Sequence, residues 1–336
     1  MDKEFYTSTD IRKIFYYDDR YKSVQTLYNA EERGEIPHAT RIDRGQVSVR
    51  NWRYTELPEI GERFGFIEKP PRQLIYTKYI QKGGVYKTTT TFNEAITFAL
   101  NGLKTLIIGQ DFELSITDII FPTQVEKLDD SERKIGLYHF LVGEASIDDI
   151  IYNTALPTLD VIPETHDLVV LDKWLNQQQR REYIYQDKLI PELSKYDVII
   201  FDHNPSWNHL IENTITCSHA VVSPLGCNLL AYNASETNLS TILDFQESMK
   251  LTHQPLIMFP TALENTNLSK QIYAQYIYKF SDITIPTPIR VSVKYQEATI
   301  NRQSIIEYAP SSQSSREYYE LITDLWKRLI SALSEK

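Results

Sequence analysis

Cysteine, glycine and long apolar runs are scarce in this chain, and each scarcity excludes a class of protein. Two cysteines among 336 residues support neither a disulfide framework nor a zinc ribbon, so we expect a reducing cytoplasm. No stretch approaches the ~18 consecutive apolar residues of a membrane span, and the opening MDKEFYTSTDIRK lacks the apolar run of a signal peptide. The net charge of −10 gives no bulk attraction to DNA, so a DNA contact needs a local patch or a separate module.

The shortage of glycine matters most in residues 81–92, QKGGVYKTTTTF. This segment has the spacing of a phosphate-binding loop, G-x-x-x-x-G-K-[ST], but Gln81 and Tyr86 stand at its two glycine positions. Gly83 and Gly84 remain, and they would let the backbone approach a phosphate and turn successive N–H groups toward it.

Three side chains after these glycines fit nucleotide chemistry. Lys87 would reach the β- and γ-phosphates, and Thr88 would offer its hydroxyl to Mg²⁺. Thr89 would cap the following helix and touch the α-phosphate, where the helix dipole favours an anion. Taken alone, the loop leaves two interpretations open: an ATP site, or a surface loop ahead of a threonine-rich helix start.

Apolar runs alternate with amphipathic stretches after residue 73. Five runs are expected to be buried strands, at 74–80, 104–109, 197–202, 220–224 and 255–260. Helical periods lie between them, which predicts an α/β fold with a mostly parallel twisted sheet flanked by helices. Ligands of such sheets bind at the carboxyl ends of strands, where the 81–87 loop is expected.

Two aspartates at strand ends decide between the two interpretations. Asp111 follows the 104–109 run, with Thr117 six residues later. Asp202 ends the run YDVIIFD in the manner of a Walker B carboxylate, which holds Mg²⁺. Three such elements in order on three strand ends favour a nucleotide site with ATP and Mg²⁺ as cofactors.

On these residues the chain resembles the ParA/MinD family of deviant Walker ATPases over about residues 74–325. The family's loop reads x-K-G-G-x-x-K-[ST], and residues 81–89 read Q-K-G-G-V-Y-K-T-T. The resemblance implies a P-loop NTPase fold and a weak, Mg-dependent ATPase that forms a sandwich homodimer on binding ATP.

The resemblance also implies roles for individual residues. Lys82 would cross to the phosphates of the partner subunit, Asp111 would position or activate the attacking water, and Thr117 would sit in the switch that reads the γ-phosphate. The implied catalytic residues are Lys82, Lys87 and Asp111, and the implied metal site is Thr88, Asp111 and Asp202. The implied nucleotide-binding residues are Gly83, Gly84, Val85, Tyr86, Lys87, Thr88, Thr89 and Asn265.

The chain departs from the family at two motifs. D-x-D-P-Q reads Gly109-Gln110-Asp111-Phe112-Glu113, so one Asp, the Pro and the Gln are absent. D-x-P-P reads Asp202-His203-Asn204-Pro205. These departures bear on the hydrolysis rate and the stiffness of the switch. We expect His203 to pack or hydrogen-bond and not to bind metal.

Paired prolines in IEKPPRQ mark a seam, so we expect a domain at 1–68, a linker at 69–73 and the ATPase domain at 74–336. The first part resembles a MerR-like winged helix-turn-helix, with a helix over 23–33 and a basic hairpin that leads to Trp52. The residues expected to contact DNA are Ser23, Gln25 and Thr26 on the helix, and Arg41, Arg44 and Arg50 on the hairpin. A small interaction domain that packs on the ATPase is the alternative.

A second, sequence-independent DNA surface is implied on the ATPase dimer. Its candidate cations are Lys270, Arg290, Lys294, Arg302 and Arg316.

These features predict an ATP-dependent DNA partitioning protein for a plasmid or other replicon, associated with the nucleoid in the cytoplasm. A ParB-like centromere-binding partner would stimulate its hydrolysis, and the N-terminal domain would bind its own operator. One alternative is a MinD-like membrane-cycling ATPase, suggested by the amphipathic tail 318–336. The other is a transcription regulator that senses nucleotide with little hydrolysis.

Overall fold

A seven-stranded sheet lies at the centre of the computed structural model, which describes residues 3–15, 23–44, 47–121, 135–251 and 253–334. Its strand order is β10-β9-β4-β8-β5-β7-β6. All neighbouring strands are parallel except β6, which runs antiparallel to β7. The strands are β4 (Leu74–Lys78), β5 (Thr105–Gln110), β6 (Tyr152–Asn153), β7 (Leu159–Ile162), β8 (Val198–His203), β9 (Ala220–Gly226) and β10 (Leu256–Thr261).

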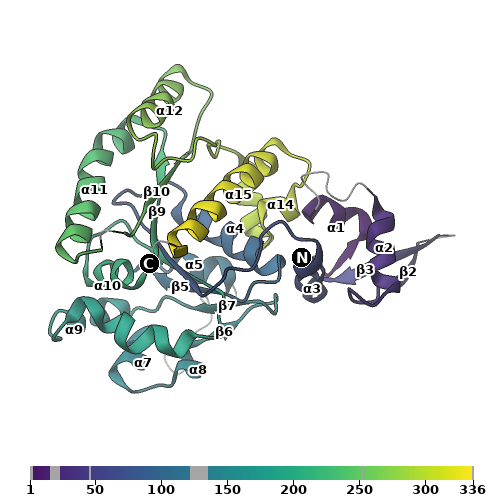
Figure 1. The fold of residues 1–336 in the computed structure, drawn as a ribbon, viewed down its shortest axis with the longest axis horizontal. Coiled ribbons are helices and arrows are strands. Elements are labelled where there is room, and N and C mark those ends of the chain that lie inside the picture. The colour runs from purple at the N-terminus through teal and green to yellow at the C-terminus, as the bar shows by residue number, and fades with distance from the viewer. Residues whose placement is uncertain (1–2, 16–22, 45–46, 122–134, 252, 335–336) are drawn as a thin grey trace.

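Helices cover both faces of this sheet (Figure 1). Leu74 and Tyr76 of β4 belong to a core cluster that includes α4 and α15, whereas Ile75 between them belongs to a cluster with α7 and α9. This alternation follows from the period of two in a strand, and burial on both faces explains the nearly continuous apolar runs. The helices are α4 (Lys87–Leu100), α5 (Ser115–Ile120), α7 (Leu137–Val142), α8 (Ile147–Ile150), α9 (Leu168–Leu175), α10 (His209–Cys217), α11 (Leu229–Ser248), α12 (Asn267–Lys279), α13 (Val293–Ile300), α14 (Ile305–Tyr308) and α15 (Gln313–Ser334).

The first 64 residues build a smaller unit around a three-stranded antiparallel sheet of order β1-β3-β2. Its elements are β1 (Phe5–Thr7), α1 (Ser8–Phe15), α2 (Val24–Glu32), β2 (Thr40–Arg44), β3 (Val47–Arg53), the 3-10 turn η1 (Tyr54–Glu56) and α3 (Leu57–Phe64). The predicted helix over 23–33 and the hairpin after it are therefore present. Assignment of this unit to the winged helix-turn-helix class stays a prediction.

The N-terminal unit packs closely on the ATPase part. A Cβ atom on Gly61 of α3 would lie 1.7 Å from the carbonyl oxygen of Leu100, the last residue of α4, so only glycine permits this approach. The side chain of Asn101 accepts hydrogen bonds from the backbone N–H groups of Phe66 (2.7 Å) and Ile67 (3.1 Å). One apolar cluster runs from α1 and α3 through α4 to α15. The predicted boundary at residue 68 therefore crosses a continuous core.

The predicted strands and the fold class agree with the structure. All five predicted strands are present with boundaries within two residues, and the mostly parallel α/β sheet is confirmed. Strand β7 was not predicted, because LPTLDVIPET is short and interrupted by Pro and Asp.

The C-terminal helix α15 uses its apolar side within the fold. Leu321, Leu325 and Leu329 are buried in the same cluster as α4. The amphipathic pattern of the tail is thus explained by packing on the sheet. Within the described ranges, no helix combines the length and apolar character needed to cross a bilayer.

Candidate functional site

The loop between β4 and α4 contains two residues with a left-handed backbone, one of them not a glycine. Tyr86 precedes α4 with φ 64° and ψ 26°, in the left-handed region, and Gly84 has φ +72°. A bulky residue rarely adopts this conformation, so its surroundings must stabilise it. The backbone oxygen of Tyr86 accepts a 2.8 Å bond from the hydroxyl of Thr90, and its ring meets the edge of Tyr295 on α13 at 6.4 Å. Tyr86 thus adopts a left-handed backbone conformation that glycine adopts more readily.

The lysine of the loop is turned inward. Lys87 is 7% exposed, and its Nζ donates a 2.7 Å hydrogen bond to the backbone oxygen of Lys82. Burial lowers the pKa of Lys87, while the negative charges of Asp202 and Asp111 oppose this shift. Both carboxylates therefore lie close enough to act on Lys87, as predicted from the three strand ends. This ammonium group is positioned to balance phosphate charge.

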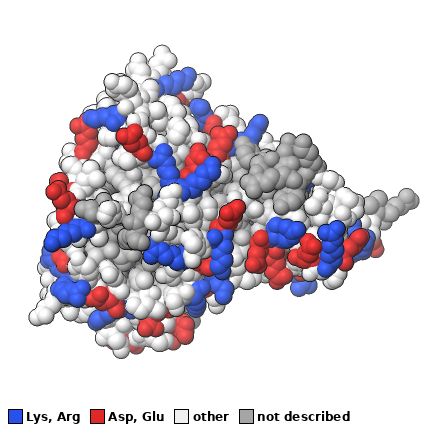
Figure 2. Space-filling model, in the orientation of Figure 1, with Lys and Arg blue, Asp and Glu red and all other residues white. Residues whose placement is uncertain are grey.

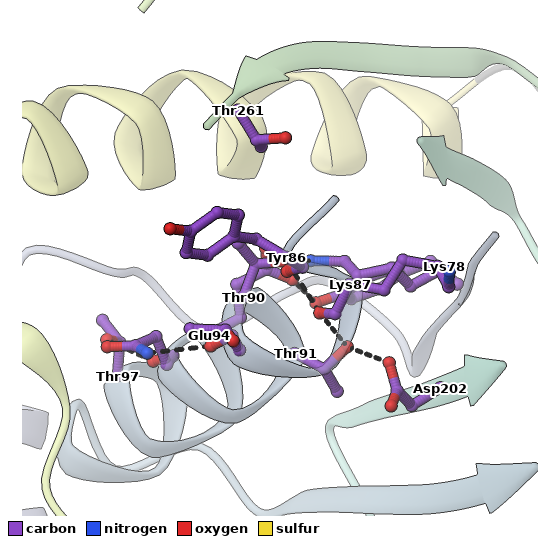
Figure 3. Close-up of polar contacts among 12 residues, drawn as sticks. Lys78, Tyr86, Lys87, Thr90, Thr91, Glu94, Thr97, Asp202 and Thr261 are labelled. Atoms are coloured by element: carbon purple, nitrogen blue, oxygen red, sulfur yellow. Dashed lines mark hydrogen bonds and ion pairs between the residues drawn. The ribbon is translucent and has the colours of Figure 1, made fainter. Parts of the chain in front are cut away.

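Asp202, at the end of β8, holds the first turns of α4. Its Oδ2 accepts a 2.7 Å bond from the Thr88 hydroxyl. Its Oδ1 accepts a 2.6 Å bond from the Thr91 hydroxyl, as Figure 3 shows. Asp202 is fully buried, and this burial raises its pKa, whereas the two hydroxyls and Lys87 favour the charged form. Two of the four threonines at 88–91, which are poor helix formers, thus have a local role in this contact.

The oxygen atoms at this point fit Mg²⁺. A hydroxyl and a carboxylate, from Thr88 and Asp202, are hard ligands of the kind that Mg²⁺ prefers. The described residues contain no cluster of three or more His, Cys, Asp or Glu that would form an all-protein metal cage. Magnesium at nucleotide sites typically takes few protein ligands, with phosphates and water completing its shell.

Asp111 lies in the segment that leads from β5 into α5. Its Oδ1 accepts a 2.9 Å bond from the backbone N–H of Glu113, and its Oδ2 accepts a 3.1 Å bond from the Ser115 hydroxyl. Leu114, directly before α5, has φ 58°. The segment is therefore tightly turned, with the Asp111 carboxylate, 6% exposed, bound into it. The place of Asp111 in a metal site with Thr88 and Asp202 stays a prediction.

A buried ion pair lies beneath the loop and was not predicted from the sequence. Lys78, the last residue of β4, is fully buried and paired with Glu94 of α4, and its Nζ also lies 3.0 Å from the Thr90 hydroxyl (Figure 3). The hydroxyl of Tyr76 donates a 2.6 Å bond to the other oxygen of Glu94. The sequence offered one sign of this pair: Lys78 and Glu94 are charged residues in stretches whose apolar pattern predicts burial. Together these groups fix the start of α4, and with it Tyr86.

Other predicted residues take varied positions around the loop. Val85 is buried, and its backbone oxygen accepts a 3.0 Å bond from the hydroxyl of Thr261 at the end of β10. Thr89 is half-buried, and Asn265 is exposed in the connection between β10 and α12. The nucleotide-binding role of these three residues stays a prediction.

His203, next to Asp202, has a packing role. Its Nε2 lies 2.7 Å from the Thr214 hydroxyl, and its ring meets that of Tyr79 edge-on. Burial lowers the pKa of His203 to about 3, so the ring is neutral at pH 7. The prediction that it hydrogen-bonds agrees with this position.

The predicted DNA-contacting residues of the N-terminal unit differ in how free they are. Ser23 caps α2 by accepting a 3.0 Å bond from the backbone N–H of Gln25, which is exposed. Thr26 is half-buried and Arg41 is exposed on β2. The side chain of Arg44 lies outside the described part of the chain.

Arg50 is already engaged inside the unit. Its guanidinium lies 3.0 Å from the Glu31 carboxylate and 3.8 Å from the centre of the Tyr28 ring. A phosphate contact from Arg50 requires this ion pair to open, which the sequence could not show.

The cations predicted on the ATPase part are scattered among acids. Arg290 pairs with Glu317 at 2.6 Å, while Lys270 on α12 is exposed. On the face in Figure 2, Lys and Arg alternate with Asp and Glu over the described residues, including the N-terminal unit. This face carries no patch of one sign among those residues.

Residues 75–254 match the family described as "AAA domain". The chromosome partitioning protein ParA of Caulobacter vibrioides is 30% identical over 255 residues, which cover 74% of this chain and 92% of that protein. The sporulation initiation inhibitor protein Soj of Bacillus subtilis is 31% identical over 246 residues, covering 73% and 95%. A plasmid partition protein of Borrelia burgdorferi has the same fold, with a TM-score of 0.60 and 22% identity over 76% of this chain and 99% of its own.

Proposed function

The chain belongs to the ParA family of partition ATPases, and from this premise we propose that it is an ATP-dependent DNA partitioning protein. The observation that carries the proposal is the contact of Thr88 and Thr91 with the buried Asp202, beside Lys87. It joins a phosphate-loop helix to a strand-end carboxylate, which is the arrangement that nucleotide hydrolysis needs.

Each residue of the loop has a task in this proposal. The ammonium group of Lys87 leaves the carbonyl of Lys82 for the β- and γ-phosphates, and the N–H groups of residues 83–86 surround them. Thr88 and Asp202 hold Mg²⁺, which neutralises charge on the phosphates. Thr89 contacts the α-phosphate and Asn265 the adenine side. Since phosphoryl transfer depends mainly on position and charge, these residues bind the nucleotide in place for hydrolysis.

Hydrolysis involves two further groups. Asp111 orients the attacking water from the segment after β5, and Lys82 crosses to the phosphates of a second subunit in an ATP-dependent homodimer. A second cation near the γ-phosphate offsets charge that Lys87 and Mg²⁺ leave uncompensated. The half-buried position of Lys82, with its backbone oxygen already at the site, is compatible with this role.

Two DNA contacts complete the proposal. The N-terminal unit, as a winged helix-turn-helix, binds an operator through Ser23, Gln25 and Thr26 with Arg41 and Arg44 on phosphate. The ATP dimer binds nucleoid DNA without sequence preference through cations such as Lys270, and a ParB-like partner stimulates its release. Arg50 and Arg290 contribute only after their ion pairs open.

The membrane-cycling alternative has lost its main support. The apolar side of the C-terminal tail is buried on the sheet, so it is not available to a lipid surface in this fold. The regulator alternative differs from partitioning in one measurable way, because it needs little hydrolysis.

The test is steady-state ATP turnover with random-sequence DNA, and ATP affinity by equilibrium binding, for the unaltered protein and for Lys87→Ala. We expect slow turnover, and a loss of ATP affinity of at least about tenfold in the variant. Lys104→Ala is a matched control, because this lysine is exposed at the opposite end of β5. Unchanged ATP affinity in Lys87→Ala would remove the loop from the proposal. ATP binding without turnover would favour the regulator.

A further inference from the structure

Gly109 of β5 owes its identity to the space beside it. A Cβ atom at this position would lie 2.3 Å from Cδ and 2.7 Å from Oε1 of Glu164, far inside the closest approach of real Cβ atoms. The φ of Gly109 is not among the positive values of the chain, so its backbone places no demand for glycine. The carboxyl group of Glu164, two residues beyond the end of β7, occupies the volume that a side chain on β5 would need.

The Glu164 carboxyl group binds the start of α5. Oε1 accepts a 3.1 Å hydrogen bond from the backbone N–H of Ile116, and Oε2 accepts a 2.8 Å bond from that of Thr117. The Thr117 hydroxyl also donates to Oε2, and it accepts a 2.9 Å bond from the backbone N–H of Glu164. Glu164 is 2% and Thr117 3% exposed. Without this carboxyl group, the backbone N–H groups of Ile116 and Thr117 would be buried without a partner.

Asp111 and Glu164 each hold one half of the segment 111–117. The Asp111 carboxylate holds its first half through Glu113 and Ser115, and Glu164 holds its second half through Thr117. Removing either set would let the whole turn move relative to the loop that contains Lys87.

We propose that Glu164 is a positioning residue for residues 111–117, and that Gly109 and Glu164 form a unit in which the segment after β7 supplies the carboxyl group for this turn. In the family pattern an Asp stands at the position of Gly109, on β5. An acidic side chain on residue 109 and that of Glu164 would enter the same volume, so the two arrangements exclude each other. In this chain the buried acid beside the turn is Glu164. The link from this turn to hydrolysis rests on the proposed function.

The Gly109–Glu164 unit can be tested with three variants: Glu164→Ala, Gly109→Asp, and the two combined. The first measurement is amide hydrogen exchange of a peptide that covers 111–121, which needs no activity. We expect each single variant to raise exchange at Ile116 and Thr117 by about tenfold, because a tenfold change corresponds to about 1.4 kcal/mol, which lies within the cost of leaving a buried donor unsatisfied. The double variant should return exchange to within about threefold of the unaltered protein.

The second measurement is kcat and KM for ATP on the same variants. Each single variant should lower kcat with KM nearly unchanged, and the double variant should recover kcat. Glu144→Ala, which removes an exposed acid between α7 and α8, is the control and should change neither. If a single variant is too unstable for kinetics, the melting temperatures decide, since only the double variant should recover.

Additive losses in the double variant, or unchanged exchange in Glu164→Ala, would overturn the inference. Absence of ATP turnover in the unaltered protein would instead contradict the proposed function. In that case the hydrogen-exchange measurement would still test whether Glu164 positions residues 111–117.

Discussion

The hydroxyl of Thr91 donates a 2.6 Å hydrogen bond to Oδ1 of Asp202. The hydroxyl of Thr88 donates to the other carboxylate oxygen, Oδ2. Thr91 is fully buried one turn into α4, whereas Thr88 stands at the loop. The two threonines therefore divide their work. In the proposed site Thr88 would share a metal with Asp202, whereas Thr91 fixes the orientation of the carboxylate.

Thr91→Val should weaken Mg²⁺ binding without removing a metal ligand. Loss of the hydroxyl frees the Asp202 carboxylate to rotate, and loss of such outer contacts typically costs 10–100-fold in metal affinity. We expect the Mg²⁺ concentration at half-maximal ATPase activity to rise about tenfold, with ATP affinity measured without Mg²⁺ nearly unchanged. Thr97→Val removes a hydroxyl from the same helix, where it bonds to the backbone of Asn93, and is the control. An equal Mg²⁺ requirement in both variants would contradict the assignment.

Lys82→Ala should separate ATP binding from hydrolysis. Lys87 uses only the backbone oxygen of Lys82, so truncating the side chain leaves the loop intact. We expect ATP affinity within about threefold of the unaltered protein, but turnover reduced at least a hundredfold, as for other cations supplied by a partner subunit. Sedimentation with ATP should show loss of the dimer. Normal turnover in Lys82→Ala would remove this residue from the chemistry.

Gly61→Ala should loosen the N-terminal unit from the ATPase part. The added methyl group would collide with the carbonyl of Leu100, so α3 must move away from α4 at a cost of about 3 kcal/mol. Chemical denaturation measures this loss. Gly83→Ala is the matched substitution, because its Cβ meets no atom within 4 Å, and it should change stability by less than about 0.5 kcal/mol. Equal stability of both variants would show that the two units are not packed as described.

The Glu164 carboxyl group should make stability depend on pH. Burial raises its pKa to about 8 from its ordinary value of 4.5, and the charge of Asp202 adds to this, against the hydrogen bonds from Thr117 and Ile116. Between these two pH values the folded state holds a proton that the unfolded state has lost. The stabilising contribution of this group is therefore complete below pH 4.5 and falls as pH rises toward 8, by at most about 1.4 kcal/mol per pH unit.

Denaturation at several pH values from 5 to 8 measures this effect in the unaltered protein and in Glu164→Gln. The stability difference between them should shift toward the variant as pH rises, because glutamine does not titrate. Glu144→Gln should keep the slope of the unaltered protein. Parallel curves for all three proteins would mean that Glu164 titrates as an ordinary carboxyl group.

The sequence predicted those candidate site residues whose place follows from their position next to a strand along the chain. Lys87, Thr88 and Asp202 each follow or end a recognisable strand, and parallel strands bring their ends to one edge. Thr91, Glu164 and the pair of Lys78 and Glu94 were not predicted. Their partners lie on other elements, and only the register of the sheet and the packing of α4 bring them together.

The ion pair of Arg50 could not be predicted for the same reason, because its partner lies on another element. Its charge and its place on a hairpin favoured a contact with DNA, whereas the structure pairs it with Glu31 on α2. Tyr86 is the opposite case, since the sequence showed a residue that does not suit a phosphate loop. The contacts of Thr90 and Tyr295 hold it in the left-handed conformation that the loop needs.

The central claim is that ATP controls DNA binding. Its most direct test is fluorescence anisotropy of the full chain on random-sequence duplex DNA, without nucleotide, with ADP and with ATP, alongside Lys87→Ala. We expect binding that appears only with ATP and is absent in Lys87→Ala. Binding that is the same in all three nucleotide conditions would contradict a partition switch and leave only a DNA-binding N-terminal unit.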